Sequence, residues 1–199
     1  MPTAIAFRDP SHGVLGTTRD IEVTGDGGRT WRVLFRTPRP VGWVGYDATG
    51  RARWRPSAPL VRPTPCPALD ETVRSGGWFL CIGQGGAGMG EKAVYHGSTR
   101  LAWTGHGITA QGYAVGIAMA RDGFGLVWES RGPLLVTRSG GSRWLALPQV
   151  GVPEVDFGIS GAALPHGLGW VILARGNIHR RLLETSDAGR TWRVVHRWN

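Results

Sequence analysis

The sequence predicts an all-β protein built from repeated units of short strands. The octapeptide T-G-D-G-G-R-T-W at 24–31 returns as T-S-D-A-G-R-T-W at 185–192, and both copies continue with Arg-Val. A long self-match near both ends of a 199-residue chain indicates a repeat architecture. The composition agrees, because 32 Gly, 13 Pro and 10 Trp suit short strands joined by tight turns better than long helices. At this length one compact domain is expected.

Weaker copies of the octapeptide end in tryptophan at 137–144, 96–103 and 47–54. Five residues before each tryptophan stands an oxygen-bearing side chain: Asp26, Thr49, Ser98, Ser139 and Asp187. A second element, a glycine followed by an apolar residue, opens an apolar run at 12–14, 76–78, 122–124 and 168–170. We therefore expect units of four short strands, with the octapeptide turn between the third and fourth strands.

Units of this length, roughly 35 to 48 residues, are typical of β-propeller blades. We predict a single small β-propeller domain over 1–199 with about five four-stranded antiparallel blades, one of them truncated. The blades are expected at about 3–37, 38–67 (partial), 68–105, 113–148 and 153–198. Five small blades could close a ring within one chain, and an open arc completed by a second copy is the alternative. Monomer and homodimer therefore both stay open.

Turn chemistry accounts for the octapeptide without any ligand. An Asp or Ser side chain accepts hydrogen bonds from backbone N–H groups a few residues on, and the following glycine supplies a positive φ. The Thr and Trp that follow begin the outer strand of the blade. The residues assigned to this structural role are Thr24, Asp26, Gly28, Thr30, Trp31, Ser139, Gly141, Trp144, Thr185, Asp187, Gly189, Thr191 and Trp192.

The string S/T-x-D-x-G-x-T-W is the Asp-box, or bacterial neuraminidase repeat, and 24–31 and 185–192 match it at every defined position. Outside about 38–67, the chain resembles the non-sialidase branch of the Asp-box β-propeller superfamily. That branch includes secreted bacterial repeat proteins and proteins similar to the photosystem II stability and assembly factor. The resemblance implies a noncatalytic binding or assembly module without a cofactor. It also favours an extracellular or periplasmic location, with a cytoplasmic one as the alternative.

The same superfamily suggests a first alternative, a sialidase-like glycoside hydrolase. Sialidases hold the substrate carboxylate with three arginines and use a Tyr nucleophile activated by a Glu, and the first arginine usually stands in an F/Y-R-I-P string. Here Phe7-Arg8-Asp9-Pro10 occupies that place, with Asp instead of Ile. Tyr46, Tyr95 and Tyr113 are the available nucleophiles, and none has a Glu at an identifying spacing. We therefore favour a protein that is not an enzyme.

Two predicted inner strands end alike, in Arg8-Asp9 and in Arg121-Asp122. In a closed ring the two arginines could form a guanidinium cluster for a carboxylated or phosphorylated ligand. We predict these four residues as the binding site, away from the octapeptide turns, and the partner as an unknown protein or an anionic glycan. The competing interpretation is a local Arg-Asp pair on each turn.

Nucleic-acid binding is the second alternative, because the net charge is +9 and 51–55, 180–181 and 192–198 mix arginine with aromatic residues. These segments alternate as half-exposed strands would and do not form one continuous patch in the sequence. Nucleic acid is therefore the less favoured partner.

Cys66 and Cys81 are the only cysteines. They could stay as two thiols or form a disulfide that closes a loop of about 15 residues, which would contribute about 3 kcal/mol. Neither they nor the six scattered histidines have metal-ligand spacing, so no metal is expected. No apolar run approaches the roughly 18 residues that span a bilayer, so no membrane insertion is expected. The first residues do not resemble a signal peptide, so export would require a signal absent from this chain.

Overall fold

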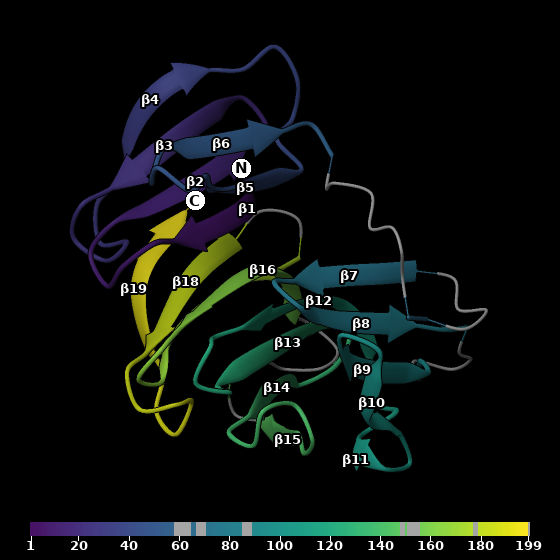
Figure 1. The fold of residues 1–199 in the computed structure, drawn as a ribbon. Coiled ribbons are helices and arrows are strands. Elements are labelled where there is room, and N and C mark those ends of the chain that lie inside the picture. The colour runs from purple at the N-terminus through teal and green to yellow at the C-terminus, as the bar shows by residue number, and fades with distance from the viewer. Residues whose placement is uncertain are drawn as a thin grey trace.

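The computed structural model describes residues 1–57, 65–66, 71–84, 89–147, 150, 156–176 and 179–198. These residues form antiparallel β-sheets joined by turns, and no helix occurs among them (Figure 1). The prediction of an all-β propeller of four-stranded antiparallel blades, one truncated, is confirmed. In the described part of the chain, no helix has the length and apolar character needed to cross a membrane.

The strands form five groups along the chain, which we name by their strands. The β1–β4 blade contains β1 (Pro2–Phe7), β2 (Gly13–Thr17), β3 (Asp20–Thr24) and β4 (Arg32–Arg36). The β5–β6 half-blade is a hairpin of β5 (Trp43–Tyr46) and β6 (Ala52–Arg55). The β7–β11 blade contains β7 (Glu71–Ser75), β8 (Trp78–Ile82), β9 (Lys92–His96), β10 (Thr99–Thr104) and the short β11 (Gly107–Ile108).

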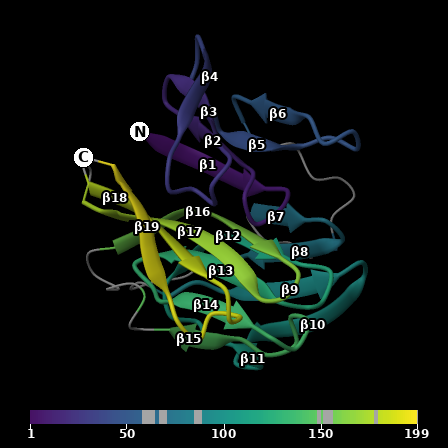
Figure 2. The ribbon, with the colours of Figure 1, turned by 90° about the vertical axis from the view of Figure 1, so that its left-hand side faces the viewer.

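The last two groups are linked into one sheet by a single pairing, Ser130 with Phe157. The β12–β15 blade contains β12 (Tyr113–Met119), β13 (Gly125–Ser130), β14 (Leu134–Thr137) and β15 (Leu145–Leu147). The β16–β19 blade contains β16 (Asp156–Leu164), β17 (Leu168–Arg175), β18 (His179–Thr185) and β19 (Arg193–Trp198). Figures 1 and 2 both show the β1–β4 blade beside the β5–β6 half-blade, above the other three blades.

The first strands of all five groups face one central cavity. Its volume is about 440 Å³, and its lining comes almost entirely from β1, β5, β7, β12 and β16. Apolar clusters fill the spaces between neighbouring blades, and Val14 and Val44, for example, share the cluster between the β1–β4 blade and the half-blade. Because apolar burial is the main favourable term in folding, these clusters hold the blades side by side.

The first and last blades join to close the chain on itself. Trp170, which is completely buried, stacks on Phe7 with ring centroids 3.9 Å apart. Its indole N–H donates to the carbonyl of Gly27 at 3.2 Å. The backbone N–H of Ile5 donates to Ser160 Oγ at 3.0 Å. Strands from the two ends of the sequence therefore share one hydrophobic core.

The three octapeptide turns at 24–31, 137–144 and 185–192 fold alike. In the first, Thr24 Oγ1 accepts from the N–H of Gly28 at 3.0 Å, and Asp26 Oδ1 accepts from the N–H groups of Arg29 and Thr30 at 3.0 and 2.9 Å. The equivalent threonine bonds in the other turns measure 3.0 and 2.9 Å. Side-chain oxygens thus satisfy backbone donors that a tight turn leaves unpaired.

The octapeptide glycines also let each turn touch a neighbouring blade. A Cβ atom on Gly28 would lie 2.6 Å from Leu182 Cδ2 of the β16–β19 blade, and one on Gly141 would lie 2.8 Å from the Trp78 ring of the β7–β11 blade. Both glycines have a positive φ, +90° and +81°. Backbone conformation and close approach therefore both require glycine here.

A backbone hydrogen bond connects the third turn to the first turn in each of the four blades other than the half-blade. The donor and acceptor pairs are Gly27 to Ser11, Gly97 to Gly77, Gly140 to Gly123 and Ala188 to Gly167, at 2.9, 2.9, 3.1 and 2.9 Å. This pattern aligns Gly97 with Gly27, so His96 occupies the aspartate position of the β7–β11 blade. The spacing from Trp103 predicts Ser98 at this position, which is two residues too far along the chain. The reason is that β9 and β10 are joined by a shorter turn, with Trp103 inside β10.

The 47–54 string joins the first and second strands of its blade, β5 and β6, whereas the other octapeptide turns join a third and a fourth strand. Asp47 Oδ1 accepts from the N–H groups of Thr49 and Arg51 at 2.9 and 3.0 Å, so the local turn chemistry is similar. The half-blade provides no third and fourth strands in the described part of the chain.

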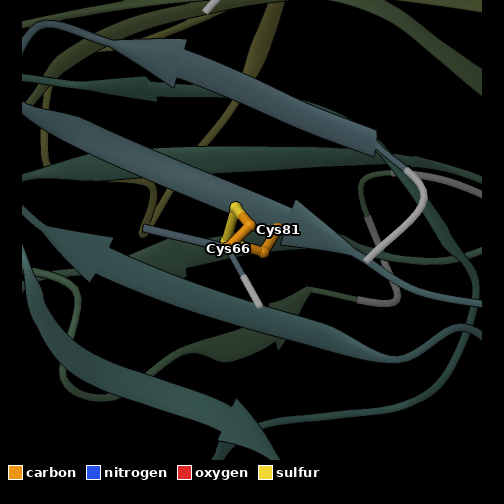
Figure 3. Close-up of a disulfide and its surroundings, with 2 residues drawn as sticks. All are labelled: Cys66 and Cys81. Carbon is orange, nitrogen blue, oxygen red and sulfur yellow. A yellow bond between two sulfur atoms is a disulfide. The ribbon is translucent and has the colours of Figure 1, made fainter. Parts of the chain in front are cut away.

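Cys66 and Cys81 form a disulfide with a Cα–Cα distance of 5.5 Å (Figure 3). Cys81 lies on β8 and is completely buried with Phe79, Ala93 and Tyr95. The bond ties the segment between the half-blade and the β7–β11 blade to a central strand of that blade.

Candidate functional site

The first candidate site begins where β1 ends. Asp9 Oδ1 accepts from the N–H groups of Ser11 and His12 at 2.9 and 2.8 Å, and the His12 ring Nδ1 lies 2.9 Å from the same oxygen. Although burial by itself raises the pKa of Asp9, these hydrogen bonds lower it to about 2. The ionised carboxylate in turn holds Arg8, whose Nε lies 3.3 Å from Asp9 Oδ2.

Arg8 points into a cleft of about 600 Å³ between the β1–β4 blade and the β5–β6 half-blade. Its Nη1 donates to the carbonyl of Gly50 at 3.3 Å, and its guanidinium lies 5.9 Å from the centre of the Tyr46 ring. Arg32 and His12 add basic side chains, and Trp31 adds an aromatic wall. Among the described residues, no Asp or Glu lines this cleft.

The octapeptide turn forms part of the same cleft, through Thr24, Gly25, Thr30 and Trp31. The expectation that a site near Arg8 lies away from these turns is therefore wrong. In a four-stranded antiparallel blade, the first and third connections lie at the same end of the sheet. The Arg8–Asp9 turn and the octapeptide turn are those two connections.

The second predicted pair lies on a different blade. Asp122 Oδ1 accepts from the N–H of Phe124 at 3.2 Å, and its Oδ2 accepts from the N–H of His166 at 2.6 Å. Asp122 therefore has a turn role like that of Asp9 and also bridges to the β16–β19 blade. Arg121 is exposed. The β16–β19 blade packs between the β1–β4 blade, which carries Arg8, and the β12–β15 blade, which carries Arg121. The described contacts of Arg8 therefore do not include Arg121. The binding role of these residues stays a prediction.

Sequence reasoning missed the partners of Arg8 in the cleft. The sequence indicates Tyr46 only as a possible nucleophile, and nothing in it points to Arg32 or His12 as neighbours of Arg8. The hairpin 43–55 interrupts the repeat. This interruption is the sequence feature that indicates a cleft, because an incomplete blade leaves part of the neighbouring blade uncovered. Every residue of β4 is exposed, with Val33 and Leu34 52% and 46% exposed.

A buried ion pair lies between the β7–β11 and β12–β15 blades. Lys92 Nζ lies 2.7 Å from Glu129 Oε1 and donates to the carbonyls of Thr109 and Gln111 at 2.9 and 2.6 Å. Both charged side chains are 0% exposed. Burial raises the pKa of Glu129 to about 7 despite the nearby ammonium, and burial lowers the pKa of Lys92. The pair has no access to a ligand and joins two blades.

The Glu129 carboxylate fits only because two glycines surround it. A Cβ atom on Gly112 or Gly132 would overlap its Oε2 atom.

Across the described ranges, no group of three or more His, Cys, Asp or Glu residues could hold a metal ion.

No family model matches the chain, and no curated protein matches it. Among solved structures, "YCF48 bound to D1 peptide" is 16% identical over 97% of this chain and 80% of that chain, with a TM-score of 0.44. YCF48 from Cyanidioschyzon merolae is 15% identical over 97% and 84%, with a TM-score of 0.30. The GH74 enzyme of Niastella koreensis is 18% identical over 96% of this chain and 24% of that chain, with a TM-score of 0.36. The propeller assignment therefore rests on the strand topology and the shared central cavity of this chain.

Proposed function

We propose that this protein is a noncatalytic binding module that holds an acidic segment of a protein partner in the cleft beside Arg8. One observation carries the proposal: the cleft of about 600 Å³ is lined by Arg8, Arg32 and His12 and, among the described residues, by no carboxylate. Although Asp9 pairs with Arg8 and His12 from outside the lining, a concave surface lined by basic side chains and by no described carboxylate attracts anionic groups and selects against cationic ones.

The position of Arg8 supports recognition of carboxylates. Asp9 engages its Nε, and Gly50 accepts from Nη1, so the guanidinium is oriented before a partner arrives. An oriented guanidinium loses less conformational entropy when it binds a carboxylate. Arg32 supplies a second cationic group, while Trp31 and Tyr46 offer apolar walls for the stems of acidic side chains.

Among the described residues no further strand follows β6 in the half-blade, and this supports a segment of extended chain as the ligand. In a complete blade, third and fourth strands would follow β6 and cover the facing side of the β1–β4 blade. Here β6 pairs only with β5 in the described chain, and β4 exposes all its residues. An extended segment of a partner can occupy such a position and use main-chain hydrogen bonds.

One contact favours a second candidate function, glycoside hydrolysis, because Tyr46 and Arg8 share the cleft. A tyrosine nucleophile needs a base within hydrogen-bond reach. Burial raises the pKa of Tyr46, and the described lining contains no carboxylate to act as that base. Hydrolysis of a fluorogenic sialoside that is lost in Tyr46→Phe would replace the binding proposal.

The direct test uses a fluorescein-labelled hexaglutamate peptide and fluorescence anisotropy at low salt. We expect saturable binding that weakens roughly tenfold in Arg8→Gln and in Arg32→Gln, because each loses a charge-assisted hydrogen bond. Arg143→Gln is the matched control, since it removes the same charge from an exposed arginine on the β12–β15 blade. Equal weakening in all three variants would mean attraction to net charge alone and would refute the proposed site. Preference for a sulfated glycan over the peptide would refute the proposed partner class.

We also infer that the chain is an Asp-box propeller. Support comes from the three octapeptide turns, whose threonine bonds repeat within 0.1 Å of one another at 3.0, 3.0 and 2.9 Å. Further support comes from the tryptophans, since Trp31 and Trp144 each donate their indole N–H to the carbonyl of the octapeptide glycine at 3.0 Å.

A further inference from the structure

A second cationic cavity lies on the β16–β19 blade, at the opposite end from its octapeptide turn. The cavity has a volume of about 250 Å³ and collects four arginines, a histidine and a tryptophan. Its lining residues are Arg175, His179, Arg180, Arg181, Arg197 and Trp198. Among the described residues no Asp or Glu lines it, so the cavity is strongly basic.

Sheet register, and not a loop alone, places these side chains. Arg175 at the end of β17 pairs with His179 at the start of β18, and Arg180 pairs with Trp198 near the end of β19. Side chains of directly opposed residues lie on the same face of a sheet. Because side chains alternate between the two faces of a strand, Arg180 and Trp198 lie on one face of the sheet, and Arg175, His179, Arg181 and Arg197 lie on the other. The cavity therefore lies at the end of the sheet, where three adjacent strands bring both sets of side chains to its lining.

Arg180 distinguishes this cavity from an ordinary basic surface. Its Nε and Nη1 atoms are buried and have no hydrogen-bond partner. Burial lowers the pKa of Arg180, yet a guanidinium stays charged in proteins. Buried donors without acceptors and a buried charge without a counter-ion both destabilise a fold. Among the described residues, the Nε and Nη1 atoms of Arg180 thus lack an acceptor that carries negative charge.

We propose that this cavity binds a tetrahedral oxyanion, a phosphate or sulfate group, with Arg180 donating to it through Nε and Nη1. Several oxygen atoms on one centre can accept from donors that converge from different strands, and guanidinium groups match phosphate and sulfate well. Arg175 and Arg197 supply further positive charge, and Trp198 closes one wall. The site is separate from the cleft beside Arg8, which lies on another blade, and the inference does not depend on the function proposed for that cleft.

The test is a thermal melt of the full chain with inorganic phosphate, pyrophosphate and sulfate, each compared with sodium chloride at the same ionic strength. We expect phosphate or sulfate to raise the melting temperature of the wild type and of the Arg143→Gln control by roughly 2 to 5 °C. The Arg180→Gln variant loses this rise. In addition, Arg180→Gln melts at or above the wild-type temperature without added oxyanion, because it removes two buried N–H donors that have no acceptor.

The melting temperature of Arg180→Gln without added oxyanion separates a ligand site from a purely structural role, because loss of a structural arginine would lower that temperature. Arg197→Gln provides an independent check, because the residue is exposed and its loss should weaken the response several-fold without affecting folding. A larger response to phosphate and pyrophosphate identifies a phosphate ester as the source, and a larger response to sulfate identifies a sulfate ester. No response beyond sodium chloride, or an unchanged response in Arg180→Gln, would overturn the proposal. Arg8→Gln should keep the full response, so failure of the first site and failure of this one are distinguishable.

Discussion

Replacing Lys92 with methionine tests whether the buried ion pair holds two blades together. Methionine is similar in length and apolar, so it fills the space of the lysine stem and removes the ammonium. Glu129 is then left buried with no cation, and the carbonyls of Thr109 and Gln111 lose their donor. The substitution therefore isolates the electrostatic role of Lys92 from its packing.

The expected cost is large because both side chains are 0% exposed. Removing one partner of a buried ion pair destabilises a protein by about 3 to 5 kcal/mol. For a domain that is stable by about 5 to 15 kcal/mol, this loss is a substantial fraction of the total. We expect Lys92→Met to stay folded at low temperature and to unfold at much lower urea concentration than the wild type.

The loss should also depend on pH in a defined direction. Burial already raises the pKa of Glu129 to about 7, and the Lys92 charge opposes this rise, so removing it raises the pKa further. The folded variant then keeps a proton that the unfolded chain releases near its ordinary carboxyl pKa. Stability falls with rising pH wherever the folded state binds more protons, by up to about 1.4 kcal/mol per pH unit. The variant is therefore more stable at pH 5 than at pH 8.

Urea unfolding followed by tryptophan fluorescence at pH 5 and pH 8 measures both effects. The double variant Lys92→Met/Glu129→Gln is the control, because it removes the titrating group and should lose the added pH dependence. The reasoning fails if Lys92→Met unfolds within about 1 kcal/mol of the wild type at both pH values. It also fails if the double variant depends on pH as steeply as the single one.

Three further outcomes follow from contacts described above. Cys81→Ser should lower the free energy of unfolding by about 3 kcal/mol in urea titrations, and reductant should leave this variant unchanged while it destabilises the wild type. Gly28→Ala should lower the free energy of unfolding by about 1 to 3 kcal/mol, because the new Cβ atom would meet Leu182 and the φ of this residue is +90°. Gly25→Ala is the control, because its Cβ atom would meet nothing within 4 Å, and it should melt at the wild-type temperature. Asp187→Asn should melt at a lower temperature than the wild type at pH 7, because hydrogen bonds from Thr191 lower the pKa of Asp187 and so stabilise the fold while the carboxylate is ionised. This stabilisation is present above the ordinary Asp pKa and is lost as the pH falls. The melting temperatures of the variant and the wild type should therefore become equal in acid.

The repeat could be predicted from the sequence because its determinants are local. Thr24, Asp26 and Gly28 form their turn with one another, and the equivalent residues recur in the other two turns. The spacing from Trp103 is misleading at 96–103 because this tryptophan lies inside a strand, whereas the feature that recurs from blade to blade is a backbone bond, here from Gly97.

The sites were harder to predict because they depend on which blades become neighbours. Arg8 and Tyr46 meet across a blade boundary, and Lys92 meets Glu129 across another. Nothing in the spacing of these residues indicates either contact. One signal was present for the ion pair: Lys92 is the only lysine among 23 Lys and Arg residues, which suggests a position that arginine cannot fill. The structure provides the reason, since its ammonium meets three acceptors in a closed space.

The burial of that single lysine gives the chain an unusual chemical surface. Amine-reactive reagents need a solvent-accessible, neutral amine, and the only side-chain amine in these 199 residues is enclosed in the native fold. Acylation of Lys92 can therefore occur only when the β7–β11 and β12–β15 blades separate. A single modified peptide, followed by mass spectrometry over time, would report the opening rate of this one blade interface without any engineered label.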